Sequence, residues 1–341
     1  MAFKTWADGE VLYAADLNTN FTISTKSKYT KIVTNTINDA GSWGLVFMGT
    51  DNATWLTQDK ISTDSGATWS AGGFSDALCN VVDKGTTGIS STLAGATDFT
   101  ADSGVTWTAS GTQPPNVTNI YDIHMFSAGV SIAVGVANTG PDSWLSSDGG
   151  DTWVQSSASS SSTFLACRMA SATIGYAIHS DGSIWKTTDA GDNWVDTTDN
   201  IDSGGIQAQE TGIHCIDTDT ILILAGRASG VNQRVYHYVN STNTVLEKFE
   251  QDEPEANWSA KSIVTADNGN VYWMLCYPNV GAAANNTYEL WMWDGTYLYR
   301  RNAWSQNENA FTNGLPALAH QDNYIYIHAF NSIAQIDVRG D

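Results

Sequence analysis

The chain has 341 residues, and its 14 tryptophans and 13 tyrosines stand in short apolar runs separated by Gly, Ser, Thr, Asn and Asp, a pattern typical of many short strands joined by tight turns. Its 36 acidic and 15 basic side chains give a formal net charge of −21, which repels phosphate backbones and argues against nucleic-acid binding. No apolar run approaches the roughly 18 residues of a membrane span, so we expect no insertion into a membrane.

The first 27 residues lack the strand pattern of the rest and are predicted to form an N-terminal arm ahead of a folded domain at 28–341. Within the arm, the stretch WADGEVLYAADLNTNF, residues 6–21, resembles a leader found at the start of many phage virion proteins, chiefly tail fibres and other appendages. Tyr13 stands where that leader usually has Thr. The alternative is an ordinary arm that packs on the rim of the domain. If the resemblance holds, the arm anchors the protein to the particle through Trp6, Gly9, Leu12, Asp16, Leu17, Asn18 and Phe21.

An octapeptide of the form [Ser/Thr]-x-Asp-x-Gly-x-[Thr/Asn]-Trp follows four times, at 62–69, 100–107, 146–153 and 187–194. Its aspartates, at 64, 102, 148 and 189, are spaced by 38, 46 and 41 residues, a period typical of a repeated supersecondary unit. In a tight turn Asp accepts bonds from backbone N–H groups, Gly adopts positive φ, and Trp buries its ring as the next strand starts. The residues predicted to do this are Asp64, Gly66, Trp69, Asp102, Gly104, Trp107, Asp148, Gly150, Trp153, Asp189, Gly191 and Trp194.

The strand pattern around the repeats divides the chain into units. We expect the first two at about 31–73 and 74–112. The third runs from 120–126 through 130–136 to its repeat, and the fourth from 164–170 to its own. Overlaying the third and fourth units places His124 and Arg168 at one level of the innermost strand.

Beyond residue 200 the repeats stop while the strand pattern continues. Runs 221–226 and 234–239 suit a fifth unit, 271–277 and 289–301 a sixth, and 323–330 with 332–338 a last one that lacks a strand. In the sixth, Asp294-Gly295 predicts a tight hairpin. The segment before Thr34 is available to supply the missing strand from the other end of the chain.

The four repeats resemble Asp boxes, also called BNR repeats, which occur in sialidases, sorting-receptor ectodomains and photosystem assembly factors. The resemblance implies an all-β fold, a β-propeller in which each box joins the third and fourth strands of a blade. It also implies that the box aspartates are elements of the fold and not catalytic. We expect seven blades, with six as the alternative, and a short N-terminal arm.

Enzymatic chemistry finds little support in the sequence. Sialidases clamp a carboxylate with three arginines and use a Tyr–Glu nucleophile with an Asp acid/base. Here only Arg168 lies on a predicted innermost strand, and the adjacent Arg300 and Arg301 point to opposite faces of theirs. The histidines and cysteines show no metal-ligand spacing, and no nucleotide-binding loop occurs, so we expect no metal and no cofactor. The chain is predicted not to be an enzyme, the alternative being a sialidase-like glycoside hydrolase.

These features together predict a phage virion structural protein, made in the host cytoplasm and mounted as a tail fibre, appendage or capsid decoration. Its partners would be other virion proteins through the arm, further copies of itself, and a host-surface glycan or protein through the propeller. A cellular assembly factor that binds partner proteins is a further alternative. Aromatics able to stack on sugars occur after residue 270, although strand alternation predicts core packing for one set of them: Trp273, Trp291, Trp293, Tyr297 and Tyr299.

Overall fold

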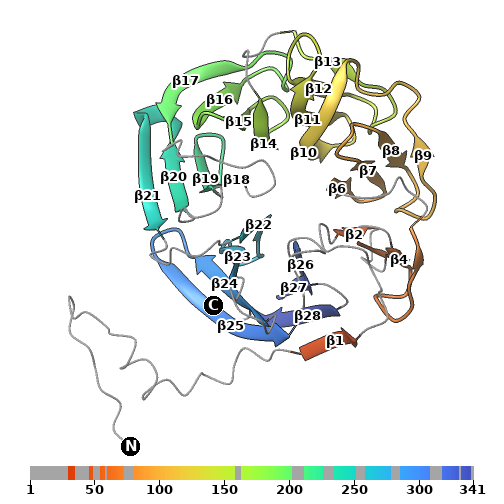
Figure 1. Ribbon diagram of the computed structural model, residues 1–341, viewed down its shortest axis with the longest axis vertical. Helices are drawn as coiled ribbons and strands as arrows, with labels where there is room; N and C mark the ends of the chain where they lie inside the picture. The colour runs from red at the N-terminus through yellow and green to blue at the C-terminus, as the bar shows by residue number, and fades with distance from the viewer. Residues whose placement is uncertain are drawn as a thin grey trace, which may run out of the picture.

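The computed structural model describes residues 30–34, 46–48, 54–57, 60–72, 80–157, 163–201, 211–225, 234–250, 258–277, 285–307, 317–329 and 332–338. Their strands form seven four-stranded antiparallel sheets that stand as blades around one axis (Figure 1). The prediction of an all-β propeller with seven blades is confirmed, and the six-bladed alternative is wrong. The predicted arm at 1–27, with its seven anchoring residues, lies outside the described residues.

The four blades that contain the repeats come first along the chain. Blade 1 consists of β2 (Val46–Met48), β3 (Thr54–Leu56), β4 (Lys60–Ser62) and β5 (Ser70–Ala71). Blade 2 consists of β6 (Asn80–Lys84), β7 (Thr87–Ser91), β8 (Thr97–Thr100) and β9 (Thr108–Ala109). Blade 3 consists of β10 (Val117–Ser127), β11 (Val130–Ala137), β12 (Ser143–Ser146) and β13 (Val154–Gln155). Blade 4 consists of β14 (Phe164–Met169), β15 (Gly175–His179), β16 (Ser183–Thr187) and β17 (Val195–Asn200).

The three remaining blades lack the repeat. Blade 5 consists of β18 (Gly212–Cys215), β19 (Thr220–Ala225), β20 (Arg234–Val239) and β21 (Thr244–Glu250), with a 3-10 turn, η1, at Asn240–Thr242. Blade 6 consists of β22 (Trp258–Thr265), β23 (Val271–Tyr277), β24 (Asn285–Trp293) and β25 (Leu298–Asn307). Blade 7 consists of β26 (Ala317–Gln321), β27 (Tyr324–Ala329), β28 (Ser332–Asp337) and β1 (Thr30–Thr34). In the described part of the chain no helix has the length and apolar character needed to cross a bilayer.

Strand β1 closes the ring by completing blade 7. It pairs antiparallel with β28, so that Thr30 lies opposite Gln335 and Thr34 opposite Ser332. The predicted borrowing of a strand from the N-terminal side is therefore confirmed. The predicted start of the first blade near residue 31 needs correction, because residues 31–34 belong to blade 7. The physical reason is that β28 would otherwise expose a row of unpaired backbone groups.

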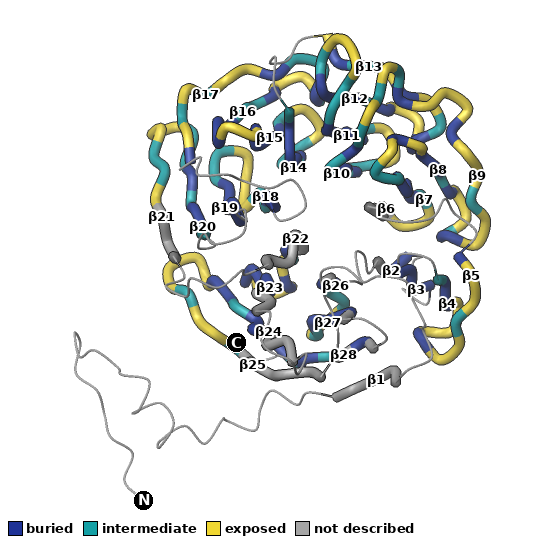
Figure 2. The backbone as a smooth tube through the Cα atoms, viewed as in Figure 1, coloured by how far each residue is buried: buried dark blue, intermediate teal, exposed yellow. Residues whose placement is uncertain are grey.

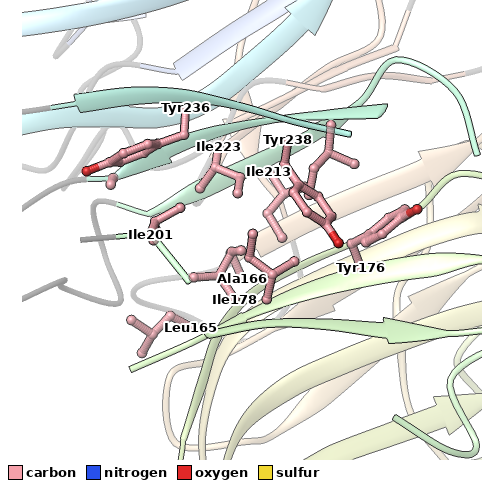
Figure 3. Packing of buried hydrophobic residues seen from close by; sticks show 12 residues of the cluster. Leu165, Ala166, Tyr176, Ile178, Ile201, Ile213, Ile223, Tyr236 and Tyr238 are labelled. Atoms are coloured by element: carbon pink, nitrogen blue, oxygen red, sulfur yellow. The ribbon is translucent and has the colours of Figure 1, made fainter. Parts of the chain in front are cut away.

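The core lies between successive blades, because the middle strands of the blades bury side chains on both of their faces. In β15, Ala177 faces blade 3, whereas Tyr176 and Ile178 face blade 5. Figure 3 shows this second interface, where they pack among Ile213 and Tyr238. Burial is concentrated in the inner strands, and exposure in the outermost strands and the turns (Figure 2). This packing leaves two places where polar side chains gather, the repeat turns and the innermost strands.

Candidate functional site

Each of the four repeats forms the turn between the third and fourth strands of its blade. These repeat turns, residues 62–69, 100–107, 146–153 and 187–194, join β4 to β5, β8 to β9, β12 to β13 and β16 to β17. Every turn begins on the last residue of the third strand, and its Trp immediately precedes the fourth. The position is the one that the resemblance implied.

Hydrogen bonds inside the first repeat turn engage both oxygens of its carboxylate. Ser62 Oγ donates to Asp64 Oδ1 at 2.8 Å and accepts the N–H of Gly66 at 2.8 Å. Asp64 Oδ1 also accepts the N–H of Thr68 at 2.8 Å, and Oδ2 accepts its hydroxyl at 2.6 Å. The Trp69 indole donates to the carbonyl of Gly66 at 3.1 Å. Side-chain bonds thus replace the ladder bonds that a tight turn cannot make.

The second and third turns repeat the whole set of bonds, and the fourth repeats most of it. In the fourth turn the Asn193 amide takes the place of the Thr hydroxyl and donates to Asp189 Oδ2 at 2.8 Å. Trp153 Nε1 donates to Gly150 O at 3.1 Å, but Trp194 Nε1 is buried with no hydrogen-bond partner among the described residues. The fourth turn therefore keeps the carboxylate bonds and lacks the indole bond.

These bonds keep the repeat carboxylates ionised. The hydroxyl of Thr68, followed by its backbone N–H, lowers the pKa of Asp64 to about 2. At Asp102, Asp148 and Asp189, burial acts in the opposite direction, but the bonds from the neighbouring Thr or Asn outweigh it and the pKa is again lowered. A carboxyl group held ionised with both oxygens bonded inside its own turn is a poor proton donor at neutral pH.

The glycine and tryptophan of each later turn pack against the preceding blade. Gly150 has φ +97, and a Cβ there would lie 2.6 Å from Ile89 of blade 2. Gly191, with φ +94, would meet Ile132 of blade 3 at 2.8 Å. Trp153 and Trp194 are 1% and 3% exposed within the same interfaces. The repeat turn is thus both a hairpin and a contact between blades.

A further bond between blades was missed by the sequence reasoning. The sixth position of the repeat is acidic only in the third and fourth turns, at Asp151 and Asp192. Asp151 Oδ1 accepts the N–H of Gly111, in the segment that leaves blade 2, at 3.0 Å. Asp192 Oδ1 accepts the hydroxyl of Ser157, in the segment that leaves blade 3, at 2.7 Å. Only the acidic residue at that position could have signalled this bond.

The innermost strands carry polar side chains that reach the following blade. Asp122 Oδ2, on β10, accepts the N–H of Cys167 at 2.9 Å, and His124 Nδ1 accepts the N–H of Met169 at 3.0 Å, both on β14. The register supports the predicted common level of His124 and Arg168. His124 lies opposite Ile132, which pairs with Leu145, the residue just before the third repeat. Arg168 lies opposite Tyr176, which pairs with Lys186, the residue just before the fourth repeat.

Farther round the axis, His214 on β18 meets Thr265 on β22, with Nε2 and Oγ1 2.6 Å apart. Burial lowers the pKa of His214 to about 4, and the nearby Arg168 guanidinium acts in the same direction. The imidazole is therefore neutral at pH 7. The arrangement places Arg168, His214 and Thr265 on the innermost strands of blades 4, 5 and 6.

The aromatic residues of blade 6 divide between core and surface. Trp273 and Trp293 are buried, which confirms the core packing predicted for one set, and Trp291 is partly buried. Tyr297 is 65% exposed, and Tyr299 is exposed with its hydroxyl donating to Asp294 Oδ2 at 3.0 Å. The two exposed rings lie on the β24–β25 hairpin, away from the innermost strands.

Two further features of the described residues concern metal ligands and cavities. No group of three or more His, Cys, Asp or Glu side chains in these ranges could hold a metal ion. A cavity of about 190 Å³ lies at the junction of blades 3 and 4, and its lining includes Val130, Leu145, Val154 and Ala190 but no ionisable side chain. The pocket offers space for a small apolar group and nothing for acid–base chemistry.

Comparisons with known proteins establish the fold of the chain and no more than the fold. No protein-family model matches the chain, and no curated protein matches its sequence. A catalytically inactive virginiamycin B lyase from Staphylococcus aureus, solved with quinupristin, superposes with a TM-score of 0.62 and 12% identity over 91% of this chain and 99% of its own. The GH74 xyloglucanase from Xanthomonas campestris gives 0.62 and 12% over 92% of this chain and 54% of its own. YCF48 from Cyanidioschyzon merolae gives 0.57 and 12% over 92% and 99%, and YCF48 also superposes in a structure bound to a D1 peptide. The chain shares a β-propeller fold with proteins that differ in function, so its function must be argued from its own residues.

Proposed function

We propose that the chain is a non-enzymatic structural protein of a phage particle, a tail fibre, appendage or capsid decoration whose propeller serves as scaffold or host-contact surface. The observation that carries this proposal is the leader-like sequence at residues 6–21. The fold is compatible with it, because β1 is the outermost strand of blade 7 and the chain therefore enters the propeller at its rim (Figure 1). An anchor at that rim leaves both ends of the axis accessible.

The geometry of the described residues supports a non-enzymatic role. The four repeat carboxylates are bonded within their own turns, as expected for the fold elements of Asp boxes. Arg168 is the single arginine on a described innermost strand, whereas a sialidase clamp requires three. Purified protein should therefore release no fluorophore from fluorogenic sialosides or other glycosides, and turnover above the rate of an Arg168→Met variant would contradict the proposal.

Binding through the propeller is supported by the fold itself. YCF48, which shares the fold, is known bound to a D1 peptide, so a propeller of this shape can hold a segment of another protein. In the proposed role, the arm contacts other virion proteins and further copies of this chain. The propeller then contacts a glycan or protein of the host surface.

Particle incorporation tests the virion role directly. A variant lacking residues 1–27 retains β1 and should fold with an unchanged melting temperature, yet be absent from purified particles. Leu17→Asp should reduce incorporation in the same way, and Tyr297→Ala, on an exposed hairpin far along the chain, should not. Normal incorporation of the truncated protein would overturn the anchoring role. Neighbouring genes that encode no portal, capsid or tail protein would favour the assembly-factor alternative.

A further inference from the structure

Arg168 is a partly buried cation whose surroundings in the described part of the chain hold no anionic partner. Among the four arginines in the described ranges, Arg300 bonds to Glu289 at 2.9 Å, Arg234 reaches the hydroxyl of Tyr236 at 3.5 Å, and Arg301 acts electrostatically on Tyr272. The groups on which Arg168 acts are the imidazole of His214 and the thiol of Cys215 on the next blade.

Neither of those neighbours is charged at neutral pH. Burial lowers the pKa of His214 to about 4 and raises the pKa of Cys215 to about 12. Asp217, which also influences Cys215, accepts the N–H groups of Asp219 and Thr220 at 2.7 and 2.8 Å in the turn between β18 and β19. The positive charge of Arg168 is therefore left uncompensated by its neighbours.

An uncompensated guanidinium at this place is unusual on physical grounds. Removing a charge from water is costly unless it is paired, and proteins pair or expose nearly all of their charges. This chain contains 36 acidic side chains, so carboxylates are abundant. A partly buried arginine that forms no ion pair with the described carboxylates points to an anion supplied from outside the chain.

The neighbouring blades present further polar groups beside Arg168. Thr265, an exposed residue at the end of β22, holds the His214 ring through the 2.6 Å contact between Oγ1 and Nε2. His124 lies at the same level as Arg168 on the preceding blade, and its Nδ1 is occupied by the N–H of Met169. In the neutral tautomer its proton is consequently on Nε2. The contact between His214 and Thr265 uses one of their two protons, so the other proton, on the His214 ring or on the Thr265 hydroxyl, can be donated to a ligand beside Arg168.

We propose that Arg168, together with His214 and Thr265, forms a binding site at the propeller axis for a ligand carboxylate. The planar guanidinium matches a carboxylate with two parallel hydrogen bonds. A monoanion is favoured over phosphate, because the net charge of −21 repels a dianion more strongly. An acidic sugar and the free C-terminus of a peptide present the same group. The carboxylate site does not depend on the proposed role in a phage particle. A failure to bind carboxylates and a failure of particle incorporation are therefore separate outcomes.

Calorimetric titration of the full-length protein tests the site with two pairs of probes. The pairs are N-acetylneuraminate with its methyl ester, and a short peptide with a free C-terminus with its amidated form. We expect saturable binding of at least one free acid, and the responding pair identifies the source. Arg168→Met should weaken that binding at least tenfold, and Arg168→Lys should weaken it less. Binding of neither acid, equal binding of ester or amide, or an unchanged Arg168→Met variant would overturn the proposal.

Thermal unfolding without ligand separates a binding residue from a structural one. Arg168→Met removes an uncompensated charge and keeps the apolar stem, so its melting temperature should equal or exceed that of the wild type. Arg300→Met is the matched control, because it breaks the bond to Glu289 and should lower the melting temperature. If Arg168→Met is the more damaging of the two, Arg168 serves the fold and the site is wrongly assigned.

Discussion

At the scale of single residues, the repeat turns show how a short side chain can define a hairpin. The carboxylate of Asp64 receives three hydrogen bonds from Ser62 and Thr68, although it lies on the surface. Each bond is formed inside eight residues of chain, so the turn needs little help from the rest of the fold. The bonds favour the ionised carboxylate and therefore couple folding to pH.

Acid should weaken the repeat turns within a defined range. Because the pKa of Asp64 falls from 3.8 to about 2 on folding, its stabilising effect is complete above pH 4 and is lost as the pH falls toward 2. The free energy of unfolding of wild type should therefore drop over this range more steeply than that of Asp64→Asn. Urea denaturation at pH 2, 3, 4 and 5 measures both. Parallel curves for the two proteins would show that folding does not lower the pKa of the Asp64 carboxyl.

The indoles of the third and fourth turns should respond differently to the same substitution. Trp153→Phe loses the bond to Gly150, whereas Trp194→Phe removes a buried N–H that has no partner in the described structure. We expect Trp153→Phe to destabilise the protein by about 1 kcal/mol more than Trp194→Phe. Replacing Trp153 by Ala should cost about 3–5 kcal/mol, and Asp148→Ala about 1–3 kcal/mol. Midpoints of denaturant unfolding measure the stability of each of these variants. Equal effects of the two Phe variants would count against the bond from the Trp153 indole to Gly150.

At the scale of the element, the blade is defined as much by its neighbour as by its own strands. The middle strands bury both faces, and the third and fourth repeat turns bond to the segments that leave the preceding blades through Asp151 and Asp192. Blades 5 to 7 lack these turns. Their described residues are joined by apolar packing, for example of Met274, Leu290 and Ile327, and by the contact of His214 with Thr265. The acidic sixth position of the repeat therefore adds a polar bond to the apolar packing at two junctions, between blades 2 and 3 and between blades 3 and 4.

Two glycines separate backbone strain from packing between blades. Gly150 and Gly295 have nearly the same φ, +97 and +95, but a Cβ at Gly150 would lie 2.6 Å from Ile89 and one at Gly295 would meet nothing within 4 Å. Gly295→Ala should cost about 1 kcal/mol, from backbone strain alone. Gly150→Ala should cost distinctly more, because two blades must move apart. Chemical denaturation of both variants measures the difference, and similar costs would show that the blade contact yields easily.

At the scale of the whole molecule, the ring depends on the pairing of β1 with β28. This pairing joins residues about 300 positions apart and leaves no open seam in the circle of blades (Figure 1). Long-range pairing of this kind is slow to form, and it covers the edge of β28 that would otherwise be exposed. Loss of the closing strand should therefore destabilise the protein.

Two truncations distinguish the closing strand from the arm ahead of it. Deleting residues 1–34 removes β1 and should lower the melting temperature sharply and expose β28 to aggregation. Deleting residues 1–27 keeps β1 and should leave the melting temperature unchanged. Calorimetry and light scattering on both proteins give the comparison. If both truncations behave like the wild type, the closure is not needed for stability.

What could be predicted from the sequence alone was local chemistry and its repetition. The spacing of Asp, Gly and Trp predicted a repeated turn, because all the bonds of a turn fall within eight residues. The propeller and the place of each turn within a blade were implied by the resemblance to Asp boxes, and the seven blades by the strand pattern that continues beyond residue 200. The same register placed His124 and Arg168 at one level, and the short last blade indicated a strand borrowed from before Thr34. The exposure of Tyr297 beside a buried Trp293 could not be decided, because alternation does not say which face another blade covers.

Only the tertiary structure decided which groups meet across blades. Asp151 bonds to a residue 40 positions away and His214 to one 51 positions away, and the local sequence does not identify either partner. The surroundings of a charge are likewise set by the tertiary structure. The charge of Arg168 is uncompensated because the adjacent strand presents a neutral imidazole, His214, and a neutral thiol, Cys215. The hydrogen bonds of a turn join residues close together in the chain, so they can be predicted from the sequence. The electrostatic surroundings of a side chain depend on neighbours in space, and those exist only once adjacent blades have packed together.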